Sequence, residues 1–457
     1  MEETEQMDIK CVIVAGTGKS GISATKLLLK HGVKVYLFDE NENRKSSDIE
    51  TEIGNMEGCH IVLGELSDDI LDAAELMVIS PGIPVDAPFT ERIRQKNIPI
   101  WSEIELAYNY GKGKIAAITG TNGKTTTTAL TGEIIKAYND KTIVVGNIGI
   151  PYTELCDTTD EDSVTVAEIS SFQLETAISF KPDVSAILNL TPDHLNRHYT
   201  FENYGNVKLS ISKNQTPEEV IVLNYDDSNT RKMGESVNAK VVYFSRLEKP
   251  AGGVYVEDGS IYIDDNGNIS KVLDIKELKL LGSHNVENVL AAVAISYYIG
   301  VPVQTIHDVA VNFKAVEHRI EYVDTINGVA YYNDSKGTNP DAAIKGIQAM
   351  ITDTYLIGGG YDKNSEYDEW IEAFDGKVKK LVLIGQTAQK IAECARRHGF
   401  DDIVLMDDLK SAVAYCHDQA KSGEAVLLSP ACASWGMFDN YEQRGRMFKE
   451  YVKSFKE

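Results

Sequence analysis

Short apolar runs alternate with amphipathic helical patterns along almost the whole chain. Near the N-terminus, residues 11–15 are apolar, a glycine-containing loop follows, and a helical pattern extends to Leu29. After Gly32, a second apolar run covers residues 33–38 and ends in Asp39. This order predicts a β-strand, a crossover helix and a second, parallel strand. Further strands are expected at residues 61–63 and 76–79, and the breaker-rich residues 80–84 end the latter.

The same alternation continues through two further segments. The middle segment begins near Trp101, with a strand at 115–119, a loop, a helix at about 125–137, and strands at 143–145, 164–169, 184–190 and 220–224. Residues 241–263 carry short alternating runs separated by glycine turns, which predicts a small antiparallel insertion. In the last segment, strands are expected at 328–333, 355–357, 381–384, 403–406 and 425–428. The fold class is therefore α/β with mostly parallel sheets, in three domains at residues 1–102, 103–314 and 315–457.

The length, charge and cysteine content of the chain limit the kinds of function that it can have. The 457 residues are enough for about three domains, and Lys plus Arg total 45 against 69 Asp plus Glu, a formal charge of −24. Such a charge disfavours nucleic acid and anionic membranes as partners, because it repels phosphate. Six scattered cysteines without a C-x-x-C pair fit a reducing compartment. No signal sequence or long apolar run is present, so we expect a cytoplasmic protein. We also expect a monomer, although no feature of the sequence establishes the oligomeric state.

The first glycine-containing loop matches a dinucleotide-binding pattern. Gly16, Gly18 and Gly21 have the G-x-G-x-x-G spacing, and Asp39 follows at the end of the next strand. Glycines there let backbone N–H groups and a helix N-terminus approach a diphosphate. The pattern alone fits a nicotinamide-dependent dehydrogenase, a protein that binds another diphosphate, or a tight structural turn.

The second loop, residues 119–126, predicts a triphosphate site. It follows an apolar strand and opens a helix, so its N–H groups can surround the β- and γ-phosphates. Lys124 can neutralise the phosphates, and the Thr125 hydroxyl can bind Mg²⁺. The loop is a shortened variant of the usual pattern, because Ile118 stands where a glycine is expected. A dehydrogenase has no use for such a loop, which disfavours that interpretation of the first one.

A series of short motifs follows in order along the chain. They lie at residues 120–125, 146–149, 168–174 and 189–194, at Tyr204 with Lys208, at residues 284, 285 and 288, and at residues 317–319 and 333–336. In these motifs and in their order, the chain resembles the ATP-dependent Mur ligase family of bacterial cell-wall synthesis. Residues 80–84, 333–339 and 428–434 resemble the branch that adds D-glutamate. The resemblance implies a Rossmann-like N-terminal domain for UDP, a central P-loop ATPase domain, and a Rossmann-like C-terminal domain that closes over ATP and D-glutamate.

The resemblance also implies a reaction and a set of site residues. ATP would phosphorylate the carboxylate of UDP-N-acetylmuramoyl-L-alanine, and the amine of D-glutamate would displace the phosphate. The implied catalytic residues are Lys124, Glu168, His194, Lys208 and Arg319. Mg²⁺ would be held by Thr125, Glu168, His194 and Lys208, the last as a carbamylated lysine. ATP would be bound by Gly120, Thr121, Asn122, Gly123, Lys124, Thr125, Thr126, Asn285, Asn288, Arg319 and Asp334. Ser20, Asp39 and Asn147 would contact the UDP substrate, and Lys336, Thr338, Lys363, Ser434 and Tyr441 would contact D-glutamate.

Three alternatives remain at this stage. A related ligase with another acceptor, such as a different muramyl ligase or a folylpolyglutamate synthetase, would use the same ATPase core. A nicotinamide-dependent dehydrogenase would explain the first loop alone. A non-catalytic nucleotide-binding regulator would bind ATP without turnover.

Overall fold

A computed structural model describes residues 9–147, 149–280, 282–314, 316–363 and 365–456. The chain forms two compact units, one of residues 1–274 with 288–310 and the other of residues 275–287 with 311–457. The predicted domain boundary at residue 315 lies outside the described residues, and the three sets of domain bounds stay predictions. Within the described part of the chain, no helix has the length and apolar character needed to cross a bilayer.

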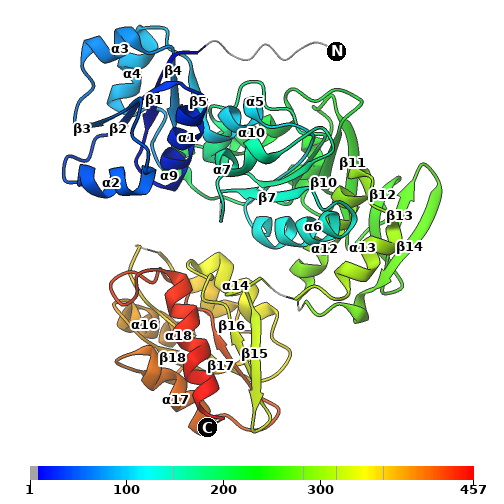
Figure 1. The fold of residues 1–457 in the computed structure, drawn as a ribbon. Helices are drawn as coiled ribbons and strands as arrows, with labels where there is room; N and C mark the ends of the chain where they lie inside the picture. Colours follow the sequence, from blue (N-terminus) through cyan, green and yellow to red (C-terminus); the bar gives the residue numbers. More distant parts are fainter. Residues whose placement is uncertain (1–8, 148, 281, 315, 364, 457) are drawn as a thin grey trace. The chain divides into compact units, whose positions relative to one another are not determined.

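The N-terminal sheet has five parallel strands in the order β3-β2-β1-β4-β5 (Figure 1). Its strands are β1 (Cys11–Ala15), β2 (Lys34–Asp39), β3 (Cys59–Leu63), β4 (Leu76–Ile79) and β5 (Ile100–Ser102), and its helices are α1 (Lys19–Lys30), α2 (Ser46–Ile53), α3 (Asp68–Ala73) and α4 (Pro88–Gln95). Every residue of β1 is buried, as expected for a central parallel strand covered on both faces. The strand β5 was not predicted from the sequence.

The second sheet has nine strands in the order β14-β13-β12-β11-β10-β9-β6-β8-β7. They are β6 (Lys114–Thr119), β7 (Thr142–Gly146), β8 (Val164–Glu168), β9 (Val184–Ile187), β10 (Val220–Asn224), β11 (Lys240–Ser245), β12 (Gly253–Glu257), β13 (Ser260–Asp265) and β14 (Asn268–Asp274). The associated helices are α5 (Glu103–Tyr110), α6 (Lys124–Tyr138), α7 (Tyr152–Leu155), α8 (Ser171–Leu174), α9 (Leu195–His198), α10 (Phe201–Leu209), α11 (Ser228–Met233), α12 (Ser283–Ile299) and α13 (Val303–Ala310).

Two predictions for this sheet need correction. The expected antiparallel insertion at 241–263 begins and ends later, because β11 and β12 still pair in parallel and only β12, β13 and β14 are antiparallel. The strand expected at 184–190 ends at Ile187. Leu188 N–H still donates to the carbonyl of Thr119, the last residue of β6, at 3.0 Å, and Asn189 then bonds the loop after β6 instead of continuing the strand.

A buried carboxylate joins the first two sheets. Glu103, the first residue of α5, accepts hydrogen bonds from Thr153 N–H at 2.7 Å, Thr153 Oγ1 at 2.9 Å and Gln173 Nε2 at 3.4 Å. Ser23 in α1 is hydrogen-bonded to the same Thr153 hydroxyl at 2.9 Å. One hydrophobic core also runs through both sheets, from Val12 and Leu28 to Ile115 and other residues of the second sheet. The two sheets therefore pack as one unit.

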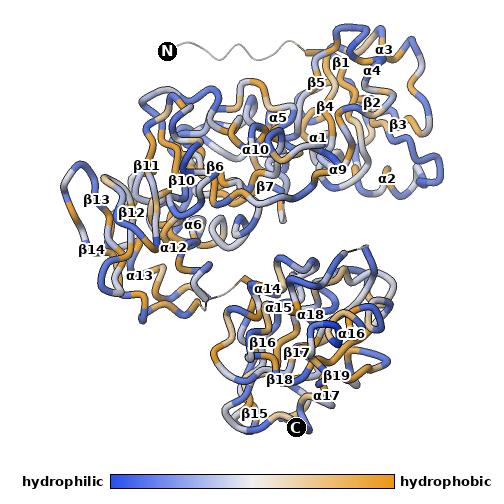
Figure 2. Tube along the Cα trace, turned by 180° about the vertical axis from the view of Figure 1, so that it is seen from behind, coloured by the Kyte–Doolittle hydropathy of each residue, from blue (hydrophilic) through white to orange (hydrophobic). Residues whose placement is uncertain are grey.

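The third sheet has six strands in the order β15-β16-β20-β17-β18-β19. The elements are β15 (Glu321–Ile326), β16 (Val329–Asn333), β17 (Thr354–Gly358), β18 (Val378–Leu383), β19 (Ile403–Leu405) and β20 (Ala425–Leu428), with α14 (Pro340–Gln348), α15 (Asp368–Glu372), α16 (Ala388–Arg397), α17 (Leu409–Gln419) and α18 (Tyr441–Ser454). The edge strand β15 is antiparallel to β16 and was not predicted, because most of its residues are only half-buried or exposed. Separate cores cover the two faces of this sheet. Figure 2 shows apolar residues concentrated along the strands of the sheets.

Candidate active site

Three neighbouring strands of the second sheet end at the same edge. The order β9-β6-β8 is parallel, so the carboxyl ends of these strands, at Ile187, Thr119 and Glu168, lie side by side. In parallel α/β sheets this edge is where ligands bind. The candidate site is built from the loops that begin here.

The loop after β6 is held in shape by protein contacts alone. Asn122 N–H donates to Asn189 Oδ1 at 2.8 Å, Asn189 Nδ2 donates to the Asn122 carbonyl at 3.0 Å, and Thr121 N–H donates to the Asn189 carbonyl at 3.1 Å. The Thr121 and Tyr204 hydroxyls are also hydrogen-bonded, at 3.2 Å. Asn189 lies in a motif recognised from the sequence, but its role as the brace of this loop was missed.

Gly123 is required where the loop turns into α6. Its φ is +88°, in the left-handed region that side chains rarely adopt. A Cβ atom at this position would lie 2.3 Å from Asn288 Oδ1. The backbone conformation and the close approach of Asn288 therefore both select glycine, and they leave the loop N–H groups at the helix N-terminus.

Two lysines meet at one carbonyl oxygen of this loop. Lys124 Nζ donates to the Gly120 carbonyl at 2.8 Å, and Lys208 Nζ, from α10, donates to the same oxygen at 3.0 Å. Lys208 is buried, and its burial followed by the positive charge of Lys124 holds the pKa of the amine well below its ordinary value. Glu168 and Asp193 oppose this shift, so both carboxylates act on the same amine. A neutral amine is the form that can react with CO₂.

One predicted metal ligand, Glu168, lies near this pair, and another, His194, directly follows Asp193, which also acts on Lys208. Glu168 is 2% exposed, and its Oε1 accepts a hydrogen bond from Asn147 Nδ2 at 3.2 Å. His194 has a positive φ of +52°, its ring packs edge-on against Phe172 at 4.9 Å, and its Nε2 lies 3.4 Å from Asp193 Oδ2. Oxygen and imidazole donors of this kind fit a divalent cation. Thr125, in the first turn of α6, is partly buried, and Thr126 is buried.

The first glycine-containing loop is also tightly packed. A Cβ atom on Gly16 would lie 2.6 Å from Ser80 Oγ, and one on Gly21 would lie 1.8 Å from the Gly16 carbonyl oxygen. The Asp39 carboxylate accepts hydrogen bonds from Thr17 N–H at 3.1 Å and Asn41 N–H at 3.0 Å. Burial would raise the pKa of Asp39, but these hydrogen bonds and that of the Thr17 hydroxyl lower it overall. Asp39 thus orders the loop, and the other predicted UDP-side residue of this sheet, Ser20, lies half-buried in α1.

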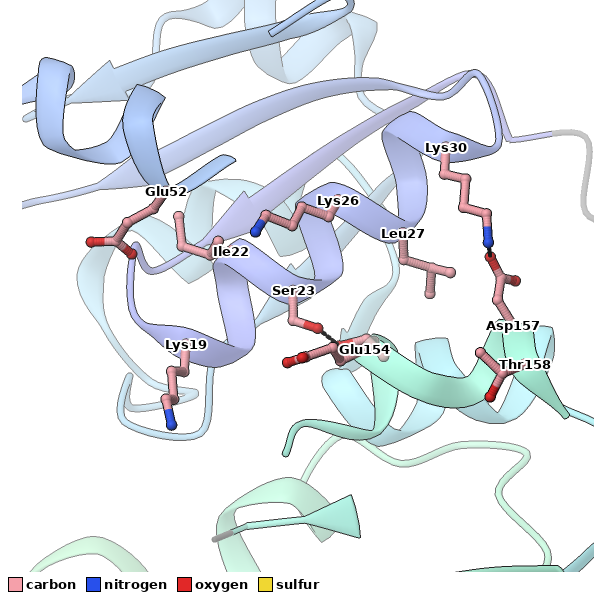
Figure 3. A pocket seen from close by; sticks show the side chains of 11 residues that line it. Lys19, Ile22, Ser23, Lys26, Leu27, Lys30, Glu52, Glu154, Asp157 and Thr158 are labelled. Carbon is pink, nitrogen blue, oxygen red and sulfur yellow. Dashed lines mark hydrogen bonds and ion pairs between the residues drawn. The ribbon is translucent and has the colours of Figure 1, made fainter. Parts of the chain in front are cut away.

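A separate cavity of about 390 Å³ opens between α1 and α7 (Figure 3). Lys19, Lys26 and Glu154 are among its lining side chains, and Ser23 and Thr153 meet at its wall. The residues that line it include none of the predicted site residues. This cavity is therefore distinct from the candidate site.

In the second unit, Asp334 and Arg319 lie close to one another. Asp334 directly follows β16, is 2% exposed, and accepts a hydrogen bond from Ser429 Oγ at 2.7 Å. Burial raises the pKa of Asp334 to about 6, and the Arg319 charge partly offsets that rise. Arg319 Nε is buried and has no hydrogen-bond partner among the described residues. The Arg319 side chain therefore keeps a donor available for a ligand.

The predicted D-glutamate residues form two pairs of cation and ring. Lys336 Nζ lies 5.8 Å from the ring centroid of Tyr441, and Lys363 Nζ lies 5.0 Å from that of Trp435, which was not predicted. Ser434 is buried, and Thr338 N–H donates to the Lys336 carbonyl at 2.9 Å. Each of the two ammonium groups therefore lies within cation–π distance of an aromatic ring.

A buried arginine that the sequence analysis missed braces these loops. Arg444 Nε donates to Ser335 Oγ at 3.0 Å, and Arg444 Nη1 donates to the Cys432 carbonyl at 3.2 Å. Ser335 Oγ in turn donates to the Tyr441 carbonyl at 2.8 Å. Burial lowers the pKa of Arg444 to about 10. No short motif identifies such a residue, because its partners, Ser335 and Cys432, come from two separate segments outside its own helix.

The two asparagines of α12 are both buried. Thr127 Oγ1 donates to Asn288 Oδ1 at 3.4 Å, which places Asn288 beside the loop after β6. Asn285 lines a cavity of about 720 Å³ in the second unit, together with Ile320, Tyr322 and Tyr332. The lining also includes Lys279, Lys314 and Glu321, so apolar and aromatic surface lies beside charged groups. Such a mixed lining suits a flat heterocycle attached to a charged group, as in a nucleotide.

Comparisons with known proteins decide the family. Three family models match: "Mur ligase MurD-like, N-terminal domain" at residues 10–102, "Mur ligase middle domain" at 118–296 and "Mur ligase, glutamate ligase domain" at 318–432. A protein of Lachnoclostridium phytofermentans is 52% identical over 98% of this chain and 99% of its own length. The chain belongs to the Mur ligase family. This membership replaces the dehydrogenase interpretation of the first loop.

Other matches agree with this assignment. A relative from Lachnospira eligens is 54% identical to this Mur ligase over 98% of the chain and 100% of its own length, and both relatives are named UDP-N-acetylmuramoylalanine–D-glutamate ligase. Among solved structures, the UDP-N-acetylmuramate-alanine ligase MurC of Thermotoga maritima matches with a TM-score of 0.62 and 19% identity, over 98% of this chain and 100% of that one. The MurF ligase of Thermotoga maritima in complex with ADP matches with a TM-score of 0.58 and 18% identity, over 100% of this chain and 98% of that one. These structures support the three-domain α/β fold.

Proposed function

We propose that this Mur ligase joins D-glutamate to UDP-N-acetylmuramoyl-L-alanine at the expense of ATP. The observation that carries the proposal is the identity of 52 to 54%, over nearly full length, to relatives named for this reaction. The three segments at 80–84, 333–339 and 428–434 point to the same branch. The enzyme works in the cytoplasm, in keeping with six cysteines that are all free thiols. The monomeric state and the lack of a nucleic acid partner stay predictions.

The chemistry requires activation of a carboxylate. An oxygen of the L-alanine carboxylate attacks the γ-phosphorus of ATP, ADP leaves, and an acyl phosphate forms. The amine of D-glutamate then attacks the acyl carbon, the C–O bond to phosphate breaks, and the amide loses a proton. Several anions meet in these steps, and like charges about 4 Å apart repel by roughly 4 kcal/mol at an effective dielectric constant near 20. Cations must offset that repulsion.

The residues at the edge of the second sheet supply that compensation. The loop N–H groups and Lys124 bind the β- and γ-phosphates, with Gly120, Thr121, Asn122, Gly123 and Thr126 forming the cradle. Lys208, held as a neutral amine, forms an N–C bond with CO₂ and releases a proton, which converts it to an anionic carbamate. Thr125, Glu168, His194 and the carbamate oxygen would hold Mg²⁺, which when bound would neutralise the phosphate charge that develops during transfer.

The remaining predicted residues complete the substrate contacts. Asn285, Asn288, Arg319 and Asp334 bind the nucleotide, and the buried Arg319 donor suits a phosphate oxygen. Ser20, Asp39 and Asn147 contact the UDP moiety, with Asp39 acting through the loop that it orders. Lys336, Thr338, Lys363, Ser434 and Tyr441 bind the two carboxylates of D-glutamate. The domains at 1–102, 103–314 and 315–457 carry the UDP, ATPase and D-glutamate functions in turn.

A phosphate-release assay tests the proposal. UDP-N-acetylmuramoyl-L-alanine is held fixed and a panel of amino acids is varied; release should require D-glutamate, and dependence on another amino acid would reassign the branch. With ¹⁸O in the acceptor carboxylate, label should appear in the released phosphate, and unlabelled phosphate would exclude the acyl phosphate.

Lys124→Ala should abolish phosphate release, whereas Lys136→Ala, at an exposed position near the other end of α6, should retain it.

A further inference from the structure

Three side chains with different donor atoms converge where α15 meets α16 in the second unit. Asp368 is the first residue of α15, Cys394 lies in the last turn of α16, and His398 caps that helix. One donor atom from each residue lies within 4.8 Å of the other two. Cys394 and His398 are four residues apart, so they project from the same side of the helix. None of the three belongs to the proposed ligase site.

The individual contacts define the cluster further. His398 Nε2 lies 2.8 Å from Asp368 Oδ1, and His398 Nδ1 lies 3.7 Å from Glu372 Oε1. Arg397 Nη2 is 3.3 Å from Asp368 Oδ1 and competes for that carboxylate. Cys394 is 3% exposed, and its burial raises the pKa of the thiol. The Asp368 side chain is 42% exposed, so an ion can enter from solvent.

We propose that Asp368, Cys394 and His398 form a site for a divalent ion of the zinc class. Zinc combines thiolate, imidazole and carboxylate ligands, commonly as three protein donors with a fourth position open to water. Mg²⁺ is disfavoured, because it requires near-octahedral oxygen ligands. On binding, the Cys394 S–H bond breaks, the proton leaves to solvent and a sulfur–metal bond forms, with no change in oxidation state.

The position of Glu372 supports the proposal. A ligating histidine usually donates its second ring N–H to a carboxylate, which fixes the tautomer and makes the free nitrogen a better ligand. Without an ion, the 2.8 Å contact between His398 Nε2 and the Asp368 carboxylate requires the proton on Nε2. Ion binding therefore shifts the proton to Nδ1, which lies 3.7 Å from Glu372 Oε1, and leaves the Nε2 lone pair for the ion. The bound ion would cross-link α15 to α16 and thereby stabilise this part of the second unit. In the ion-free cluster the Cys394 thiol is hydrogen-bonded to the Asp368 carboxylate, so ion binding replaces that hydrogen bond.

Titration of the full-length protein with Cd²⁺ tests the site. Excess Mg²⁺ is kept present so that oxygen-rich sites hold the harder ion, and the sulfur-to-cadmium charge-transfer absorption in the ultraviolet reports a bound thiolate. The wild type should show this band with saturation near one Cd²⁺ per chain, and Zn²⁺ should displace it. Its thermal midpoint should rise with either ion.

Variants separate the proposal from nonspecific binding. Cys394→Ala should abolish the band, and His398→Gln and Asp368→Asn should each weaken Cd²⁺ binding at least tenfold. Cys416→Ala, which removes another buried thiol of the same unit, should leave the band unchanged. A wild type without the band, or a band that survives in all three cluster variants, overturns the proposal. D-glutamate-dependent phosphate release by the same variants shows that the ligase function is intact, so the two proposals fail independently.

Discussion

Replacing Gly123 by alanine is a direct test of how the phosphate-binding loop is built. The substitution is expected to reduce the stability of the folded protein in two separate ways. A side chain in the left-handed region costs about 1–2 kcal/mol. In addition, the new Cβ would lie 2.3 Å from Asn288 Oδ1, so the asparagine must move, and forced overpacking of this kind costs about 1–3 kcal/mol. Gly123→Ala should therefore destabilise the protein by roughly 2–5 kcal/mol.

The chain offers a matched control. Gly267 has the same φ of +88° and lies in the turn between β13 and β14, and a Cβ atom added there would have no neighbour within 4 Å. Gly267→Ala should thus lose only the backbone term of about 1–2 kcal/mol and retain full activity. Urea unfolding gives the stability of each variant, and phosphate release with increasing ATP gives KM and kcat. Gly123→Ala should also raise the KM for ATP, because the loop N–H groups are displaced.

A double substitution isolates the clash. In an Asn288→Ala background the Oδ1 atom is gone, so the further loss of stability caused by Gly123→Ala should shrink toward the value for Gly267→Ala. Equal losses for the two glycine variants in the wild-type background would refute the argument. So would a Gly123→Ala loss that is unchanged when Asn288 is alanine.

Three further predictions concern buried ionisable groups. Lys208→Ala should abolish phosphate release, and short carboxylates such as acetate should partly restore it; no restoration across a range of concentrations would count against a carbamate. Burial raises the pKa of Asp334 from 3.8 to about 6, so the folded protein binds this proton more tightly than the unfolded chain does. Relative to Asp334→Asn, the wild type should therefore lose roughly 2 kcal/mol of stability as the pH rises from 4 to 7. A stability difference in urea unfolding that does not change with pH would contradict this. Glu103→Ala leaves the buried Thr153 donors unsatisfied, so it should lower the free energy of unfolding in urea by at least about 2 kcal/mol. Glu154→Ala, at an exposed position, should lower it little. Equal losses of stability in the two variants would contradict this prediction.

Much of the fold could be predicted because buried parallel strands are apolar throughout. The predicted strands at 11–15, 76–79, 220–224 and 425–428 have the same bounds as β1, β4, β10 and β20, whose residues are all buried. The edge strand β15 was missed, because a strand with one exposed side mixes polar and apolar residues and resembles a loop. The end of β9 was misplaced, because Asn189 bonds Asn122 in the loop after β6 instead of extending the strand, and the local pattern does not show that contact.

The local sequence at residues 119–126 was enough to predict a phosphate-binding loop, because the glycines, Lys124 and Thr125 that characterise such a loop are neighbours in the chain. Tertiary structure alone decided that Lys208 and Lys124 share the Gly120 carbonyl, and that Asp334 is buried against Ser429. The reason is that short-range geometry follows from neighbouring residues, whereas burial and the charge nearby depend on segments brought together by folding. Burial and nearby charge set the protonation state of a side chain, and the protonation state decides whether the side chain acts as an acid, a base or a nucleophile.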